Sequence, residues 1–315
     1  MAFVRILDLK NFKTGENKIR ANRLAGQYMV YNVDWTSLIS GSAALLAIFL
    51  VFFWGVTLDK VWQKALLGAT AQTWLILFCF NVSHDVAHDL IFKRNPKYRM
   101  LNNIFGYMMA TPTLTPYHGF KETHLEHHRK TNTPVDDPNH WIVRGSLPWL
   151  LGKLLIAPFG DYKEMLRYSR VKPMPHVAKT FFLFWIGTAL FTAALIWLFG
   201  FTNVLFMWLI PAYINYVIVF AFVAVIPHRQ SPDAPGEQVE RIAIFPSYLQ
   251  SLSSFLHAGH NYHLLHHMYP RVPSHKYAAF AKHLVDIQEE QAAERKKADA
   301  PQQDNDGSAV AALAE

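Results

Sequence analysis

The chain has 315 residues, of which 51% are hydrophobic and 17% charged, with 23 Phe, 13 Tyr and 9 Trp. Such an apolar composition, unevenly distributed, indicates a membrane protein. The net charge of +7 comes from Lys and Arg spread along polar segments, which fits attraction to a membrane surface better than binding to nucleic acid. The single cysteine, Cys79, excludes an intramolecular disulfide, a CxxC zinc site and a cysteine-ligated iron–sulfur cluster.

Four apolar stretches are long enough to cross a bilayer, at about 37–58, 62–82, 180–200 and 203–226. The N-terminal arm, 1–36, precedes them and holds many charges without a long apolar run, so we expect no cleaved signal peptide. The second stretch carries one charge, Lys64, close enough to its end for the side chain to reach the membrane surface.

The connections between these stretches are short. The first two meet at Thr57–Val61 and the last two at Gly200–Asn203, which predicts two antiparallel hairpins. The arm, the middle segment (83–179) and the C-terminal part (227–315) then share one side of the membrane. Of the 30 Lys and Arg, only Lys60 and Lys64 fall near the other side, so the crowded side is expected to be cytoplasmic.

The sequence therefore predicts an all-α membrane protein, with four transmembrane helices in two hairpins and a cytosolic helical cap. Residues 37–285 form the expected membrane domain, within which 96–109 could be a helix near the interface. Residues 286–315 contain almost no large apolar side chain. We expect this last segment to begin as the end of a helix and to finish disordered.

Three histidine clusters lie just outside the apolar stretches. One is an HxxxH and two are HxxHH: His84 and His88; His124, His127 and His128; His263, His266 and His267. On a helix, residues three and four apart share a face, so each cluster presents two or three imidazoles in one direction. The topology puts all three clusters on one side of the membrane, although that argument used no histidine.

Eight converging imidazoles indicate transition metal, and because a structural zinc site is filled by about four ligands, eight suggest two ions. His228, directly after the fourth stretch, is a reasonable ninth ligand. Imidazole suits Zn, Cu, Fe and Ni alike. Four further residues are candidates to support the ligands through hydrogen bonds: Asp85, Asp137, His140 and Asn261.

A site built almost wholly of imidazole at a membrane surface suits a redox metal better than a zinc hydrolase, which usually needs a carboxylate base. A substrate that enters sideways from the bilayer would be long and hydrophobic. Two other classes compete: a metal transporter or sensor, whose ligands should lie at membrane depth, and a b-heme electron carrier, which needs histidines deep in paired helices.

The series HxxxH, HxxHH, HxxHH, with a hairpin between the second and third clusters, resembles the membrane fatty acid desaturase superfamily over about residues 30–285. The resemblance implies a di-iron enzyme that uses O2 and two electrons to desaturate or hydroxylate unactivated C–H bonds. It implies that the eight clustered histidines are iron ligands. His228 matches an extra histidine of relatives that also place an Asn one turn earlier, where this chain has Ala224.

Within the superfamily, Pro227-His228-Arg229 and the run 261–273 resemble β-carotene hydroxylases of the desaturase type, as does the stretch 137–140. That group tends to have a third histidine after the first cluster, where Phe92 stands here. The resemblance therefore leaves two substrate classes open, a fatty acyl lipid and a carotenoid.

The sequence carries no fused b5-like heme domain, ferredoxin cysteine set or flavin motif, so the resemblance implies a separate electron donor. The basic side chains near the clusters would either dock an acidic ferredoxin or b-type cytochrome or contact phospholipid. They are Lys121, Arg129, Lys130 and Arg144.

Overall fold

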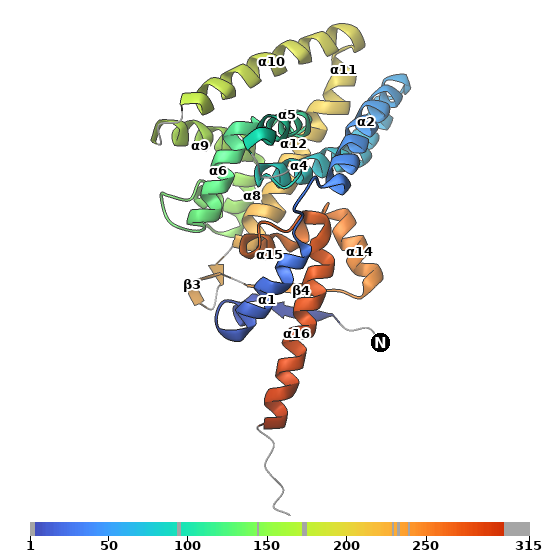
Figure 1. Cartoon of the computed structure of the whole chain (residues 1–315). Coiled ribbons are helices and arrows are strands. Elements are labelled where there is room, and N and C mark those ends of the chain that lie inside the picture. Colours follow the sequence, from blue (N-terminus) through green and yellow to red (C-terminus); the bar gives the residue numbers. More distant parts are fainter. Residues whose placement is uncertain are drawn as a thin grey trace, which may run out of the picture.

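The computed structural model describes residues 4–92, 96–143, 145–171, 175–228, 230–231, 234–238 and 240–298. Helices dominate it (Figure 1). Four of them are long and apolar enough to cross a membrane: Trp35–Thr57, Val61–Ala87, His176–Phe199 and Phe201–His228. They match the four predicted stretches, and the second and fourth run further than predicted, so that they carry His84 and His228 on their own last turns.

The first and third spans are the single helices α2 (Trp35–Thr57) and α10 (Pro175–Phe199). The second span comprises α3 (Val61–Leu67), the π-helical turn η2 (Gly68–Gln72) and α4 (Thr73–Ala87). The fourth span comprises α11 (Phe201–Val204), η4 (Leu205–Leu209), α12 (Ile210–Val219), η5 (Phe220–Val225) and α13 (Ile226–His228). Both η4 and η5 are π-helical, and η5 directly precedes the turn that carries His228.

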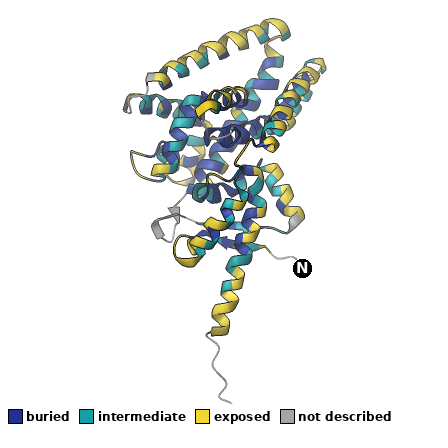
Figure 2. Ribbon diagram, viewed as in Figure 1, coloured by how far each residue is buried: buried dark blue, intermediate teal, exposed yellow. Residues whose placement is uncertain are grey.

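The second and fourth spans form the centre of the bundle, and half of the most apolar part of each is buried. The outward faces of α2 and α10 are exposed (Figure 2), as expected for helices that meet lipid. Lys64 does not reach outward as predicted. It is 7% exposed, and its ammonium donates to the Asn203 side chain and to the Val56 carbonyl, which ties the turns of the two helix pairs together.

The segment between the second and third spans is also helical. It contains η3 (Pro96–Tyr98), α5 (Arg99–Ala110), α6 (Tyr117–Lys130), α7 (His140–Val143), α8 (Leu147–Leu155) and α9 (Ala157–Val171). The helix α5 coincides with the one expected at 96–109. It packs on α4 through Phe105, Met109 and Ala110, which are buried in the same apolar cluster as Val82 and Val86. The helix α6 follows it and carries the second histidine cluster.

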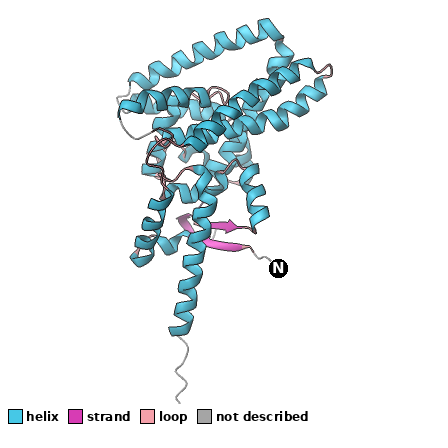
Figure 3. Ribbon diagram, turned by 45° about the vertical axis from the view of Figure 1, so that its right-hand side comes forward, coloured by secondary structure: helices cyan, strands magenta, loops and turns pink. Residues whose placement is uncertain are grey.

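The two ends of the chain form a common layer, which we call the terminal cap. Its N-terminal part is β1 (Arg5–Asp8), η1 (Leu9–Phe12) and α1 (Gly15–Tyr28). Its C-terminal part is β4 (Arg241–Ile244), α14 (Ser247–Leu256), η6 (His260–Tyr262), α15 (His263–Met268), η7 (Ser274–Lys276) and α16 (Tyr277–Ala298). Figure 3 shows its strands beside α16.

The all-α expectation needs one addition, because two small antiparallel sheets are present. β1 pairs with β4, with Arg5 opposite Ile244, and β2 (Gln230–Ser231) pairs with β3 (Ala234–Gln238). The first pairing joins residues from opposite ends of the sequence. Leu7, Leu9 and Phe12 from the arm then pack with Phe280 and Leu284 of α16 in one buried cluster.

The segment after residue 285 begins as the end of a helix, as expected. The helix α16 crosses this position without a break and reaches Ala298. Its polar residues bind the arm: Asp286 lies 2.7 Å from Arg5, the Gln288 side chain accepts from the Asp8 backbone N–H at 2.9 Å, and Glu290 lies 3.1 Å from Arg20. Residues 286–298 thus belong to the terminal cap, and the rest of the predicted tail, 299–315, lies outside the described residues.

Candidate metal centre

The structure gathers all nine predicted ligands beside the C-terminal ends of the second and fourth spans and divides them into two groups. The first group is His84, His88, His124, His128 and His266, and the second is His127, His228, His263 and His267. Within each group the donor nitrogens lie within 4.8 Å of one another. Seven of the nine histidines are fully buried, and His128 and His267 are partly exposed.

Four Nε2 atoms of the first group form a closed ring. The sides of this ring measure 2.9 Å from His88 to His124, 3.1 Å from His124 to His128, and 3.0 Å from His128 to His266 and from His266 back to His88. The centre of a square with sides of about 3.0 Å lies about 2.1 Å from each corner, and metal–imidazole bonds are about 2.0–2.1 Å long. The ring therefore has the size of four ligands around one ion.

His84 completes the first group. It is 2% exposed, and neither of its ring nitrogens has a hydrogen-bond partner. Its ring centre lies 4.3 Å from that of His266 and 4.5 Å from that of His124, so it faces the ring of nitrogens. A buried imidazole without any partner is costly, and a bound cation would satisfy it.

The second group has the same spacing with one donor fewer. The Nε2 atom of His228 lies 3.2 Å from those of both His127 and His263, and the Nε2 atoms of His263 and His267 lie 3.0 Å apart. Ala224, one turn before His228 on the helix, has no donor to add. Two ions with five and four nitrogen donors fit these residues, and the donor set contains no thiolate or carboxylate.

Helix geometry explains how the clusters divide. On α6, His124 and His128 are four residues apart and serve the first group, whereas His127 points to the second. On α15 the order is reversed, because His263 and His267 serve the second group and His266 the first. Each cluster thus presents two imidazoles in one direction, as expected, and the remaining histidine of each HxxHH, His127 or His266, belongs to the other group.

The protonation states favour metal binding. Burial lowers the pKa of His124, His263, His266 and His267 well below the usual value, and the neighbouring imidazoles lower it further. The same causes lower the pKa of His128 to about 2. These imidazoles are therefore neutral at physiological pH, which is the form that binds a metal.

Three oxygen atoms hold ligand rings by their Nδ1 atoms. Asp137 accepts from His127 at 2.7 Å, as the sequence suggested, and the same carboxylate accepts from the backbone N–H groups of Asn132 and Asn139. The Tyr277 hydroxyl lies 3.1 Å from His266 Nδ1 and itself donates to a backbone carbonyl. The Thr131 hydroxyl lies 3.3 Å from His267 Nδ1. Such partners fix the ring orientation and leave Nε2 for the ion.

Sequence reasoning gave Tyr277 and Thr131 no such role. Thr131 follows His127 by four residues, and its hydroxyl donates to the His127 carbonyl at 2.6 Å, so helical spacing places it beside the cluster. Tyr277 follows the run 261–273 that resembles β-carotene hydroxylases, and the resemblance extends to it, which was the available signal.

The other three predicted supporting residues have different surroundings. Asp85 accepts from the Ser274 backbone N–H at 2.9 Å and from its hydroxyl at 2.6 Å, while His84 Nδ1 is 3.9 Å away. It therefore anchors the loop after the third cluster to α4. Asn261 lies near serines of α14, at 3.4 and 3.5 Å. Among the described residues, His140 belongs to neither group of histidines, and Asn261 has no contact with a member of either group in the hydrogen bonds above.

Two further histidines, His260 and His118, lie outside both groups. His260 is buried, and its ring lies 5.7 Å from that of His84 and 5.5 Å from that of Phe80. His118 instead pairs with Tyr107, whose hydroxyl lies 2.5 Å from its Nδ1 atom. His260 thus borders the first group, and His118 belongs to the packing between α5 and α6.

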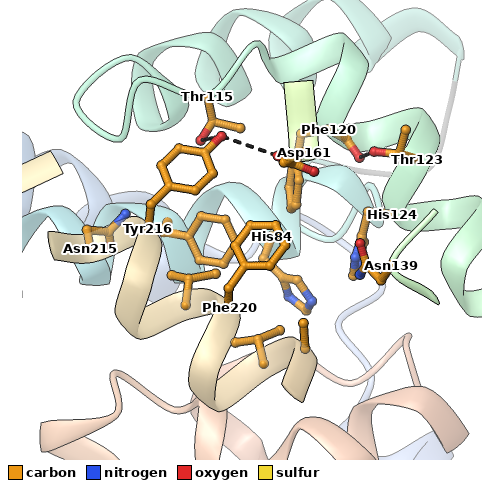
Figure 4. Close-up of a pocket in the computed structure, with 14 residues that line it drawn as sticks. His84, Thr115, Phe120, Thr123, His124, Asn139, Asp161, Asn215, Tyr216 and Phe220 are labelled. Atoms are coloured by element: carbon orange, nitrogen blue, oxygen red, sulfur yellow. Dashed lines mark hydrogen bonds between the residues drawn. The ribbon is translucent and has the colours of Figure 1, made fainter. Parts of the chain in front are cut away.

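A narrow cavity of about 50 Å³ reaches the first group (Figure 4). His84 and His124 line one part of it, and aromatic walls come from Phe80, Phe120 and Phe220. The cavity thus brings apolar side chains up to two of the clustered histidines.

The candidate basic side chains differ in their freedom. Lys121 is paired with Asp89 at 2.7 Å, and Arg129 with Glu126 at 2.7 Å, although the Arg129 side chain remains 58% exposed. Lys130 is exposed at the end of α6, and Arg144 lies outside the described residues. The exposed pair, Arg129 and Lys130, directly follows the second histidine cluster.

Comparison with known proteins decides which family the site belongs to. The family model described as "Fatty acid desaturase" matches residues 60–297, which is most of the chain and includes all nine histidines. The chain belongs to the fatty acid desaturase family. Together with the four apolar helices, this supports an integral membrane protein.

Named relatives include both lipid and carotenoid enzymes. An sn-1 acyl-lipid omega-3 desaturase (ferredoxin) of Nostoc sp. (strain 36) is 22% identical over 62% of this chain and 60% of its own length. An sn-1 oleoyl-lipid 12-desaturase of Picosynechococcus sp. is 23% identical over 62% of both chains. A beta-carotene ketolase of Paracoccus sp. (strain PC1) is 27% identical over 66% of this chain and 76% of its own. This family member thus matches less than two thirds of the length of either desaturase.

Proposed function

We propose that this family member is a membrane di-iron oxygenase that uses O2 and two electrons to desaturate or hydroxylate an unactivated C–H bond of a long-chain fatty acyl lipid. The observation that carries the proposal is the pair of all-histidine groups, with five and four donors, inside a chain of the desaturase family. Nitrogen-only groups of this size favour a redox metal over hydrolytic zinc, which takes three protein ligands and one water.

Two bound iron ions would supply the oxidising power, which the side chains of this protein lack. In desaturation the substrate loses two hydrogen atoms, and O2 takes up these, two electrons and two further protons to become two waters. The chain's own residues perform the rest. The nine histidines hold the ions, and Asp137, Tyr277 and Thr131 orient the rings. The aromatic walls of the cavity align the substrate chain with the first group.

Electrons would come from a separate donor, a ferredoxin or a b-type cytochrome. One relative carries "ferredoxin" in its name, which supports the first. The exposed Arg129 and Lys130 would attract an acidic donor to the side of the second group, where His267 is partly exposed. Reversing the charge of both Arg129 and Lys130 should abolish the turnover that the protein donor supports. Turnover with a chemical reductant should stay normal, and this pair of results would support the docking site.

We further propose that both termini and the histidine groups face the cytoplasm, because Lys60 and Lys64 are the only basic residues near the opposite turns. The sole native cysteine, Cys79, is fully buried, so single introduced cysteines can be labelled with little background. In intact cells an impermeant maleimide should label Lys60→Cys and spare Lys130→Cys. The reverse pattern would contradict the orientation.

The experiment that tests the function is expression in a host supplied with candidate lipids, followed by mass analysis of the products. A loss of two hydrogens marks desaturation, and a gain of one oxygen marks hydroxylation. The changes His127→Ala and His266→Ala should each abolish product while the protein still inserts. The control His283→Ala removes an exposed imidazole that pairs with Tyr28, and should leave turnover intact. Unchanged turnover in both ligand variants would refute the proposal.

A carotenoid β-ring hydroxylase is the second candidate. The relative named beta-carotene ketolase covers a larger share of this chain than the two desaturases do, and this favours it. Supplying carotenoids in the same host separates the two substrates. The class of metal transporter or sensor predicts metal flux in vesicles without O2 consumption. The position of the histidines at the ends of the spans, away from membrane depth, argues against it.

A further inference from the structure

A buried polar group lies in the cavity at the end away from the histidines. Figure 4 shows Thr115, Tyr216 and Asp161 together at one end and the rings of His84 and His124 at the other. Tyr216 belongs to α12 of the fourth span, Asp161 to α9, and Thr115 to the loop before α6. Three separate parts of the chain thus bring oxygen atoms to one point.

The hydrogen bonds inside this polar group are long. The Tyr216 hydroxyl donates to the Asp161 carboxyl at 3.3 Å, and the Thr115 hydroxyl donates to the Tyr216 oxygen at 3.4 Å. Hydroxyl hydrogen bonds are commonly about 2.7–2.8 Å long. Thr115 also accepts a hydrogen bond from the Thr113 hydroxyl at 2.8 Å, whereas Tyr216 and Asp161 satisfy each other only weakly. An oxygen atom in the cavity would make better bonds with these two.

Asn215 provides a second, independent observation. It lines the same cavity, is only 1% exposed, and its Oδ1 atom has no hydrogen-bond partner. An unsatisfied amide on a membrane-spanning helix is costly, and polar groups at such places commonly serve a ligand. In Figure 4 Asn215 lies on the Tyr216 side, away from both histidines.

The chemistry of the polar group favours a neutral ligand. Burial raises the pKa of Asp161 to about 7, so this carboxyl keeps its proton more readily than an exposed one. A protonated carboxyl both donates and accepts, as do the hydroxyls beside it. A ligand carboxylate or phosphate would meet no cationic partner among the residues lining the cavity.

We propose that Asn215, Tyr216, Asp161 and Thr115 form a subsite for a neutral oxygen, a hydroxyl or a carbonyl, carried by the hydrocarbon substrate. With that oxygen held at this end of the cavity, the chain extends past Phe80 and Phe120 to the first histidine group. The subsite would therefore decide which carbon lies beside the metal. This inference rests on the proposed function, because it names a feature of the substrate for the same site.

Binding to the purified full-length protein tests the subsite without turnover. Octadecane, octadecanol, methyl stearate and stearate are supplied at equal mole fraction in detergent micelles, and the bound probe per chain is measured by mass spectrometry. Octadecanol, methyl stearate or both should bind about tenfold more tightly than octadecane, as expected for one or two net hydrogen bonds. Stearate should not share this gain. Equal binding of the three uncharged probes, or a preference for stearate, would overturn the proposal.

Variants locate the effect. Asn215→Leu and Asp161→Leu, which each remove the polar group, should each reduce the preference for the oxygenated probe at least severalfold while binding octadecane normally. Glu164→Gln, on the same helix as Asp161 but paired with Arg167, is the matched control and should keep the preference. A preference that survives in both subsite variants would overturn the proposal. If Asn215→Leu fails to fold, Asp161→Leu decides.

The two proposals can fail separately. A protein without iron or turnover that still prefers octadecanol would retain the subsite and refute the di-iron oxygenase. An active iron enzyme that binds octadecane and octadecanol equally would retain the di-iron oxygenase and refute the subsite.

Discussion

The change Asp137→Asn offers a selective test of the second histidine group. Asp137 is 2% exposed and accepts three hydrogen bonds, from His127 Nδ1 at 2.7 Å and from the backbone N–H groups of Asn132 and Asn139 at 2.7 and 2.8 Å. An amide of the same size has one oxygen, so at least one donor would face an NH2 group. It also lacks the negative charge that makes the imidazole a better donor of electrons to a metal.

The magnitude follows from the bond that is weakened. A hydrogen bond to a charged group contributes about 1.5–3 kcal/mol, and losing the carboxylate partner of a ligating histidine costs about 10–100-fold in metal affinity. His127 belongs to the second group, whereas Asp137 has no bond to a member of the first. We therefore expect the iron content to fall from two per chain toward one under mild chelation.

The assay is iron per chain after dialysis against a graded series of chelator concentrations. Asp136→Asn is the matched control, because Asp136 is the exposed neighbour of Asp137. The control should release both ions at the chelator concentration of the unmodified protein. Loss of both ions together in Asp137→Asn, or no change at all, would refute the assignment of Asp137 to one ion of two.

Three further predictions concern other parts of the structure. Tyr277→Phe removes the oxygen beside a ligand of the first group and should weaken iron binding there about tenfold in the same assay, whereas the exposed Tyr248→Phe should not. Gly68→Ala would place a Cβ atom against a backbone carbonyl of η4 and should lower stability by about 1–3 kcal/mol, seen as a lower midpoint in a thermal aggregation assay. Gly187→Ala, with open space around it, should leave the midpoint unchanged. Equal losses in the two variants would contradict this packing. Because the pKa of Asp161 is raised from 3.8 to about 7, its ionisation destabilises the fold increasingly between about pH 4 and 7, by at most about 4 kcal/mol. The melting temperature of the unmodified protein, measured relative to that of Asp161→Asn, should therefore fall as the pH rises from about 4 to 7 and level off above pH 7. A difference that stays constant with pH would contradict the raised pKa.

The predictable part of the site came from spacing and topology. Apolar stretches about twenty residues long, joined by very short turns, indicated the number of spans and placed the three clusters on one side of the membrane. Helical spacing indicated that His84 and His88 share a face, and they do lie in one group.

The division of the histidines into two groups needed three-dimensional information. His127 belongs to the other group from His124 and His128. Successive residues of a helix are about 100° apart, so the His127 ring points away from that of His128 and toward His228 of another helix. Periodicity shows that such a residue points elsewhere, but it does not show which distant histidine it meets. For the same reason the sequence indicated neither Tyr277 as the partner of His266 nor the ordering of residues 286–298 by the arm.

The cavity was the least predictable feature. Asp161 and Asn215 are single polar residues without any motif, and their meaning appears only when α9 and α12 bring them to the same space. An isolated acid in a sequence is most often a solvated side chain. Only its position beside Tyr216 in the lining of the cavity distinguishes this one.

The most direct test of the central claim is metal analysis combined with X-ray absorption on the purified, fully loaded protein. The account predicts two iron ions per chain, each surrounded mainly by imidazole nitrogen at about 2.0–2.2 Å, with an iron–iron signal that is lost when the second ion is removed. A single zinc ion per chain, or iron bound by oxygen with the histidine variants unchanged in metal content, would contradict it.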